Sequence, residues 1–115
     1  MFGRISNLDN GETLTLKNCR NEVEVVSSGD YVGGLVGQIQ GYKNSRGQWY
    51  SGISFENCKQ LKGVAGGDYV GMLVGDMNIG SFTQTNSVVN GNAVGLGENV
   101  ATQEKPYYGS WKNNQ

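Results

Sequence analysis

The sequence predicts an all-β protein made of stacked copies of one unit. Residues 14–41 return as residues 53–80, so that Gly29-Asp-Tyr-Val-Gly-Gly-Leu-Val-Gly37 reappears as Gly67-Asp-Tyr-Val-Gly-Met-Leu-Val-Gly75. No window carries the i, i+3, i+4, i+7 pattern of a helix. Repeated units of this kind stack and bury a shared core. We therefore expect a short right-handed parallel β-helix, a solenoid of about three rungs with a C-terminal cap. A small antiparallel β-sandwich is the alternative.

Each unit contains three short extended segments. Residues 14–17 and their repeat alternate apolar and polar side chains, the period of a half-buried strand. In the second segment, Glu22–Val26, we expect Val23 and Val25 to point inward and the glutamates outward. The third, Tyr31–Val36, is apolar on both faces or bends at its glycines. Three strands per turn, separated by Gly and Asn corners, describe a parallel β-helix.

The first two copies align in two blocks. Residues 18–19 (Asn-Cys) match residues 57–58 at a shift of 39, whereas residues 29–33 match residues 67–71 at a shift of 38. One residue is therefore lost between the blocks.

A weaker third copy and a partial one complete the repeats. Residues 86–87 (Asn-Ser) take the Asn-Cys place, residues 91–95 take the place of residues 67–71, and residues 3–5 match residues 37–39. The predicted organisation is: 1–13, the tail of a truncated preceding repeat; 14–52, repeat 1, with a lateral loop over 40–51; 53–80, repeat 2; 81–97, a degenerate repeat 3; and 98–115, a C-terminal cap or extension.

Glycines recur in register between the copies. A P-loop needs Gly-Lys-Ser/Thr opening a helix, and a dinucleotide fingerprint needs a βαβ unit; neither context occurs. We interpret these glycines as tight corners with positive φ, or as places where a stacked backbone leaves no room for a Cβ. They are Gly33, Gly34, Gly37, Gly71 and Gly75.

Cys19 and Cys58 occupy the same repeat position. Stacked rungs lie about 4.8 Å apart, but their side chains point the same way, which disfavours the dihedral angle of a disulfide. Ser87 replaces them in the third copy, which indicates a small inward residue. Two cysteines without histidine do not complete a zinc site. We expect buried free thiols, with a disulfide as the alternative.

Polar residues recur at two turn positions. Asn18, Asn57 and Asn86 are expected at a corner, where stacked amides hydrogen-bond along the stack and to the turn backbone. A row of amides that reads a polymer is the alternative. Asp30 and Asp68 are expected to cap a turn; the alternative is a pair of stacked carboxylates that binds calcium or acts as acid and base.

Aromatic residues form two groups. Tyr31 and Tyr69 make a ladder that we expect to pack between rungs. The longest linker, Gln40–Ser51, is expected to project sideways as a contact loop, because insertions in solenoids become loops on one face. Its candidate contact residues are Tyr42, Lys43, Arg46, Trp49 and Tyr50.

The block over residues 29–37, preceded by Asn18-Cys19, resembles a GLUG repeat. The second copy has Met72 in place of the second Gly of the Gly-Gly pair, and the third keeps only Gly-Asn-Ala-Val-Gly. The family recurs in large bacterial surface and secreted proteins, including adhesins. The resemblance implies a cell-surface or extracellular repeat module and implies no catalytic residues. We expect no cofactor.

Composition excludes two classes of partner. Nine Lys and Arg against ten Asp and Glu give a formal charge of −1, whereas nucleic acids and anionic membranes need clustered cations. No apolar run approaches the roughly 20 residues that span a bilayer. Residues 1–4 show no signal-peptide pattern. We expect no nucleic-acid partner and no membrane insertion.

The repeats predict a non-catalytic structural or binding module, and the resemblance implies that it belongs to a bacterial cell-surface or secreted adhesin-like protein. It would present lateral loops on a β-helical stalk. Expected partners are neighbouring repeats, or another copy at the open end of the β-helix, and a host protein or glycan. One alternative is a self-assembling fibre subunit that stacks end to end. The other is a carbohydrate-active β-helix that uses Asp30 and Asp68.

Overall fold

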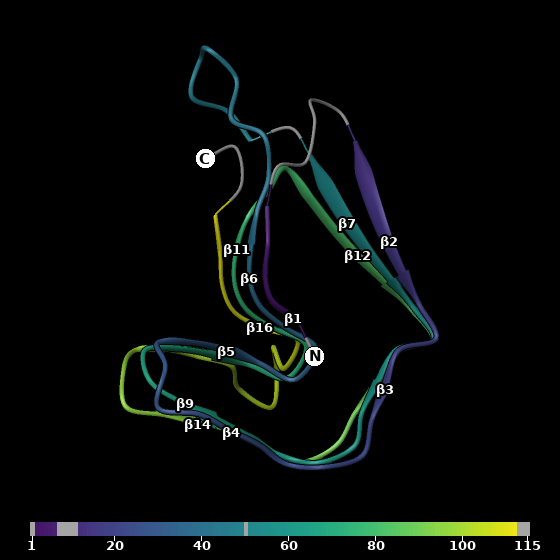
Figure 1. Cartoon of the computed structure of the whole chain (residues 1–115), viewed down its shortest axis with the longest axis vertical. Coiled ribbons are helices and arrows are strands. Elements are labelled where there is room, and N and C mark those ends of the chain that lie inside the picture. Colours follow the sequence, from purple (N-terminus) through teal and green to yellow (C-terminus); the bar gives the residue numbers. More distant parts are fainter. Residues whose placement is uncertain (1, 7–11, 50, 113–115) are drawn as a thin grey trace.

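The protein is all-β, with parallel strands in several sheets (Figure 1). The structure is a computed structural model and describes residues 2–6, 12–49 and 51–112. These residues form sixteen strands and no helix. Every pairing between named strands is parallel. The antiparallel sandwich is therefore wrong for the described residues, whose sole antiparallel pair is the isolated bridge between Lys43 and Trp49.

The strands belong to five sheets, named A to E here. Sheet A has the order β1 (Phe2–Ile5), β6 (Val36–Gln40), β11 (Val74–Asn78) and β16 (Tyr108–Lys112). Sheet B contains β2 (Thr13–Lys17), β7 (Gly52–Glu56) and β12 (Ser81–Thr85). Sheet C contains β3 (Arg20–Asn21), β8 (Lys59–Gln60) and β13 (Val88–Val89). Sheet D contains β4 (Val25–Val26), β9 (Val64–Gly66) and β14 (Ala93–Gly95), and sheet E contains β5 (Tyr31–Gly33), β10 (Tyr69–Gly71) and β15 (Asn99–Val100).

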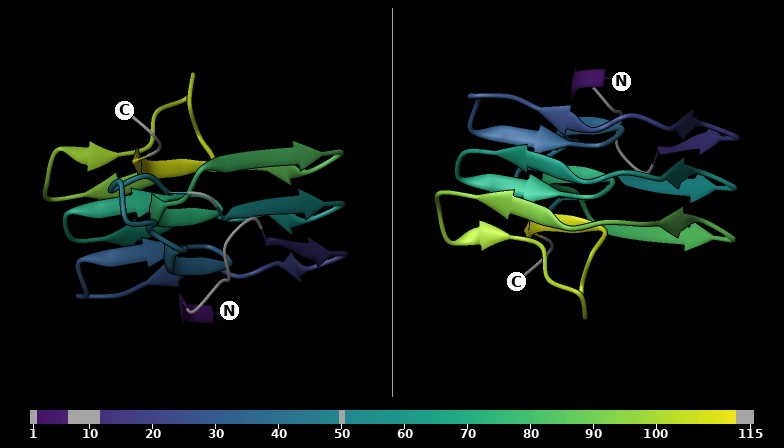
Figure 2. Two further views of the ribbon diagram at one scale, coloured as in Figure 1. Left: turned by 90° about the horizontal axis from the view of Figure 1, so that it is seen from above. Right: turned by 90° about the horizontal axis from the view of Figure 1, so that it is seen from below.

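The chain visits the sheets in one fixed order, B, C, D, E and then A, and repeats that order on each pass. Seen from the side, the passes lie as layers one above another (Figure 2). This arrangement fits a β-helix-like solenoid. Each complete pass has five short strands rather than the expected three. Residues 20–21 form an additional strand before the second segment, in which only Val25–Val26 is a strand, and the third segment is divided by a bend at Gly34-Leu35.

The register of the first two passes confirms the alignment of the repeats. Leu14 pairs with Ile53 and Val25 with Val64, a shift of 39 residues. Tyr31 then pairs with Tyr69, a shift of 38. The partial first copy is confirmed too, because Ile5 pairs with Ile39 as the match of residues 3–5 with 37–39 requires.

The third pass differs from the predicted alignment. Gly95 pairs with Gly66 in sheet D, so residues 91–95 do not occupy the place of residues 67–71. That place belongs to Asn99-Val100, which pairs with Tyr69-Val70. The strand β16 then pairs with β11, Trp111 lying beside Met77. Residues 99–112, expected in a cap, therefore continue the stack.

An insertion in the third pass explains why the sequence did not reveal that residues 99–112 continue the stack. The chain takes eight residues from Val100 to Tyr108, where the preceding pass takes four from Val70 to Val74. The extra residues include Lys105-Pro106, whose proline suggested a break in the pattern. The inserted residues do not match the preceding copies in sequence, although β15 before them pairs with β10 and β16 after them pairs with β11.

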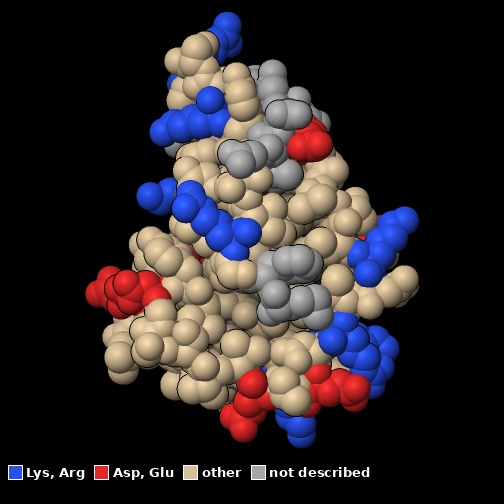
Figure 3. Space-filling view, viewed as in Figure 1, with Lys and Arg blue, Asp and Glu red and all other residues tan. Residues whose placement is uncertain are grey.

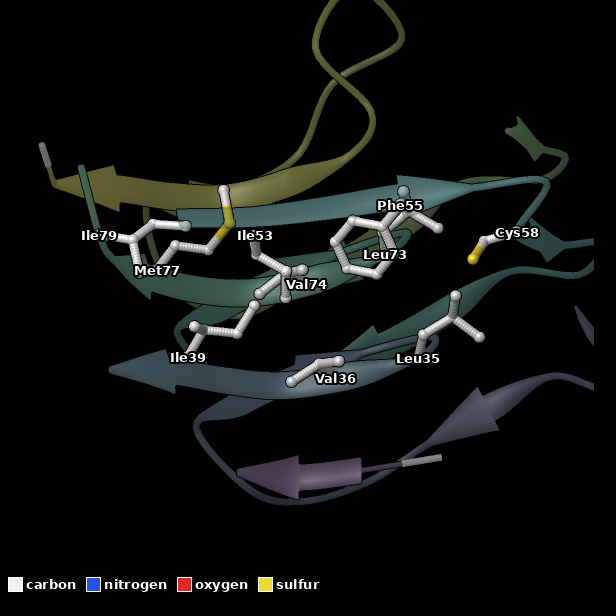
Figure 4. Close-up of a cluster of buried hydrophobic side chains, with 10 residues drawn as sticks. All are labelled: Leu35, Val36, Ile39, Ile53, Phe55, Cys58, Leu73, Val74, Met77 and Ile79. Atoms are coloured by element: carbon white, nitrogen blue, oxygen red, sulfur yellow. The ribbon is translucent and has the colours of Figure 1, made fainter. Parts of the chain in front are cut away.

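The core consists of two clusters. The larger lies between sheets A and B and contains Leu35, Ile39, Phe55, Leu73 and Met77, all fully buried (Figure 4). The smaller lies between sheets D and E and contains Val32, Val64, Val70 and Met72. Val25 packs against this second cluster, but Val23 is 65% exposed. The expectation that Val23 points inward is wrong, because it lies in the bend between β3 and β4.

The recurring glycines serve close packing. A Cβ added to Gly33 would lie 2.0 Å from the carbonyl oxygen of Val36, and one added to Gly71 would lie 2.0 Å from that of Val74. Among the described residues, positive φ occurs at Gly47 and Gly91 and at Asn18, Asn57 and Asn86, whose φ values are 56°, 54° and 53°. The asparagines, rather than the block glycines, thus form the left-handed corner.

Candidate functional site

The lateral loop, expected over residues 40–51, comprises residues 41–51 because Gln40 is the last residue of β6. Asn44 organises it. The Asn44 carboxamide oxygen accepts hydrogen bonds from the backbone N–H groups of Arg46 and Gln48, each at 2.9 Å. The backbone closes the same turn, since Asn44 N–H donates to Gln48 at 2.9 Å and Gly47 N–H donates to Asn44 at 3.0 Å. Gly47 has φ +79°, which favours glycine. The turn over residues 44–48 therefore has a defined conformation.

The base of this loop is tied to the stacked passes. Ser51 is fully buried; its hydroxyl accepts from Tyr42 N–H at 3.1 Å, and its carbonyl accepts from Gly80 N–H at 2.7 Å. Lys43 forms the antiparallel bridge with Trp49, and the Lys43 ammonium lies 5.3 Å from the centroid of the Trp49 ring. That distance is within the range of a cation–π contact.

The loop presents cationic and aromatic side chains away from the body of the molecule. It projects beyond the layers at the top of Figure 1, and Lys and Arg side chains gather there in Figure 3. Tyr42, Lys43 and Arg46 are exposed, and Trp49 is half-buried. Tyr50, the fifth candidate contact residue, lies outside the described residues. The four described candidates are thus brought together in one short loop.

The tyrosine ladder is confirmed, but it lies on the surface. The Tyr31 and Tyr69 rings stack with centroids 4.8 Å apart and planes 11° apart, and Tyr31 is 44% exposed. Each ring covers one face of the other. The ladder therefore offers less aromatic surface to a sugar than two separate rings would.

The neighbouring carboxylates, Asp30 and Asp68, are both exposed. Their backbone carbonyls accept hydrogen bonds from the next pass, from Tyr69 N–H at 2.7 Å and from Asn99 N–H at 3.2 Å. The described residues contain no cluster of three or more His, Cys, Asp or Glu that would hold a metal ion.

Both cysteines are free, Cys58 buried and Cys19 half-buried. The Cys58 thiol donates to the Leu16 carbonyl at 3.2 Å. Burial raises the pKa of the Cys58 thiol, which favours the unreactive protonated form. Cys58 therefore behaves as the small inward residue that the repeat predicts.

Asp76 is a buried carboxylate that the sequence interpretation missed. It is 6% exposed and accepts a hydrogen bond from the Gln38 amide at 3.3 Å. Burial raises the pKa of Asp76, against the opposing effects of Gln38, Lys112 and Ser110. One feature of the sequence could have indicated it: the position that Asp76 occupies in its copy is held by Gln38 and Arg4 in the other copies.

No family model, curated protein or solved structure matches the chain. Within the described residues, no helix is long and apolar enough to span a membrane.

Proposed function

We propose that the chain is a non-catalytic binding module: a short right-handed parallel β-helix, similar to GLUG repeats, that presents its lateral loop for contact. The observation that carries this proposal is the unequal connection between sheets A and B. Residues 41–51 join β6 to β7, whereas two residues, Ile79 and Gly80, join β11 to β12. The stack does not need the longer connection, yet that connection is internally hydrogen-bonded and anchored at Ser51.

The chemistry of the loop favours an acidic or glycan partner. Lys43 and Arg46 supply two cations, and Tyr42 and Trp49 supply rings. Rings of this kind stack on sugar faces and anchor protein interfaces, while Arg pairs with carboxylates. We place the module in a bacterial surface or secreted adhesin-like protein, where such a partner is a host glycan or protein.

A loop replacement tests this function. Residues 41–51 are exchanged for Ile-Gly, the connection that already joins β11 to β12. Wild-type and replaced chains are applied to immobilised neutral glycans, uronic-acid glycans and purified extracellular-matrix proteins. We expect binding by the wild type that the replaced chain loses while its β circular dichroism is retained. Equal binding by both chains, or no binding by the wild type, would contradict the proposal.

A second candidate is a fibre subunit that stacks end to end. Among the described strands, β1 to β5 have a sheet neighbour on one side only, and so do β12 to β16. Edge strands of this kind are templates for pairing with another chain. Light scattering over a range of concentrations distinguishes this function, because a fibre subunit grows in mass and a presenting module stays monomeric.

A further inference from the structure

A groove of about 320 Å³ lies at the corner where sheet B meets sheet C. Four residues line it, one amide and one cation from each of two passes: Asn18, Arg20, Asn57 and Lys59. We call it the corner groove. Lys and Arg side chains lie on both sides of this corner, at the right of Figure 3. The turn from β2 to β3, which forms this corner, lies far from the lateral loop in Figure 1.

The backbone holds the corner groove in a fixed shape. Asn18 and Asn57 both occupy the left-handed region, with φ 56° and 54°. The Asn18 N–H donates to Glu56 at 2.9 Å, and the Lys59 N–H donates to Cys19 at 2.8 Å. Since these backbone groups are engaged between the passes, the asparagine and cationic side chains remain as the donors that line the groove.

The two cations face each other across the strands. Arg20 pairs with Lys59 in register, and parallel strands lie about 4.8 Å apart. Like charges directly opposite one another destabilise a sheet. In the third pass the matching residue is Val88, which pairs with Lys59, so the row of like charges does not continue. The groove therefore concentrates positive charge between the first two passes.

Nearby carboxylates offset this charge only in part. Glu22 lies 3.1 Å from the Arg20 guanidinium, and Glu56 lies 3.7 Å from Lys17, which does not line the groove. These are the two ion pairs found among the described residues, and Lys59 belongs to neither of them.

We propose that the corner groove binds an oxyanion: a carboxylate, sulfate or phosphate group carried by another molecule. An oxyanion between Arg20 and Lys59 converts a repulsive pair into a bridged one. The guanidinium offers two parallel N–H donors, the ammonium a point charge, and the two carboxamides neutral donors. This site stands on its own residues and does not depend on the lateral loop.

Titration of the ¹⁵N-labelled chain with sodium sulfate, against sodium chloride at equal ionic strength, tests the site. We expect saturable chemical-shift changes of the Asn18 and Asn57 side-chain amides and of the Arg20 Nε–H.

Lys59→Gln and Arg20→Gln should each weaken sulfate binding about tenfold, the equivalent of 1.4 kcal/mol. The matched control, Lys105→Gln, removes the same charge from an exposed bend and should change affinity less than about twofold.

Two results would overturn the oxyanion site. One is the absence of saturable shifts up to about 0.1 M sulfate, where screening of exposed charges is already strong. The other is equal weakening by Lys59→Gln and Lys105→Gln, which would assign the effect to net charge. Sodium glucuronate and a glucuronic-acid oligomer then identify the source. Equal affinity per group indicates a single oxyanion, and tighter binding of the oligomer indicates an acidic polysaccharide.

Discussion

At the scale of single residues, the three corner asparagines show how one residue type fixes a turn. Asn18, Asn57 and Asn86 have φ values within a few degrees of one another, in a region that residues other than Gly, Asn and Asp seldom occupy. Each stands just before the small residue of its pass, Cys19, Cys58 or Ser87. The repeated Asn is therefore explained by backbone geometry.

Replacing the middle asparagine tests this explanation. Asn57→Ala should lower the free energy of unfolding by about 1 kcal/mol, because alanine pays the steric cost of the left-handed conformation. Asn57→Gly should cost less, since glycine adopts it without a Cβ clash. Urea unfolding measures both. Asn90→Ala, at an exposed residue without positive φ, is the control. A glycine variant less stable than the alanine variant would contradict the explanation.

The buried Asp76 predicts a pH dependence of stability. Its pKa is raised from the ordinary 3.8, chiefly by burial, so at pH values between the unfolded and the folded pKa the folded chain keeps a proton that the unfolded chain has lost. The stability that this carboxyl contributes is fully present below 3.8 and is lost as pH rises through the raised pKa.

Asp76→Asn should therefore gain stability relative to the wild type as pH rises from acid to neutral. The amide keeps an oxygen for the Gln38 donor and carries no charge to desolvate. Thermal unfolding across this pH range measures the difference between the two chains. The exposed Asp68→Asn serves as control. A difference between Asp76→Asn and wild type that does not vary with pH would refute this reasoning.

At the scale of elements, the strands of sheets A and E approach because glycine stands at their shared bends. Gly33 and Gly71 have no space for a Cβ, whereas a Cβ on Gly3 in β1 would meet nothing within 4 Å. Glycine is thus required at the ends of β5 and β10, whereas β1 could hold a larger residue at Gly3.

Gly71→Ala should lower the free energy of unfolding by about 2–3 kcal/mol, because the added methyl would meet the Val74 carbonyl and the Gly109 N–H. Gly3→Ala should change stability by no more than about 0.5 kcal/mol. Chemical denaturation of the two variants gives the comparison. Similar losses in both would show that glycine flexibility, and not close approach, is what matters.

At the scale of the whole molecule, the third pass decides how much of the core is covered. Phe82, Tyr108 and Trp111 pack together, with Trp111 5.9 Å from Phe82 and 5.8 Å from Tyr108 between ring centroids. The Trp111 indole N–H donates to the Ile79 carbonyl at 3.0 Å. This aromatic group packs against the larger core cluster, so β16 belongs to the stack.

Trp111→Ala should destabilise the protein by about 2–3 kcal/mol and expose β11 amides to hydrogen exchange, because it removes ring contacts and the bond to Ile79. Trp49→Ala, the matched change in the lateral loop, should cost less than about 1 kcal/mol. If Trp111→Ala were no more harmful than Trp49→Ala, the segment would be an appendage and not a third pass.

Much of the candidate site follows from the alignment, since unequal linkers locate the lateral loop and matching positions locate the corner. The remainder depends on contacts between passes. Sequence shows neither that Asn44 closes the loop nor that Lys43 lies over Trp49. Arg20 and Lys59 differ in type and do not stand out as a repeat, so their pairing is visible only in the register.

The sequence by itself determined the all-β class, the pairing of the first two copies and the corner asparagines, because near-identical segments stack in register and backbone preference is local. Only the tertiary structure decided the course of the third pass, the outward direction of Val23 and the burial of Asp76. These depend on where the chain bends and on what the next pass covers, and neither is encoded in one segment alone.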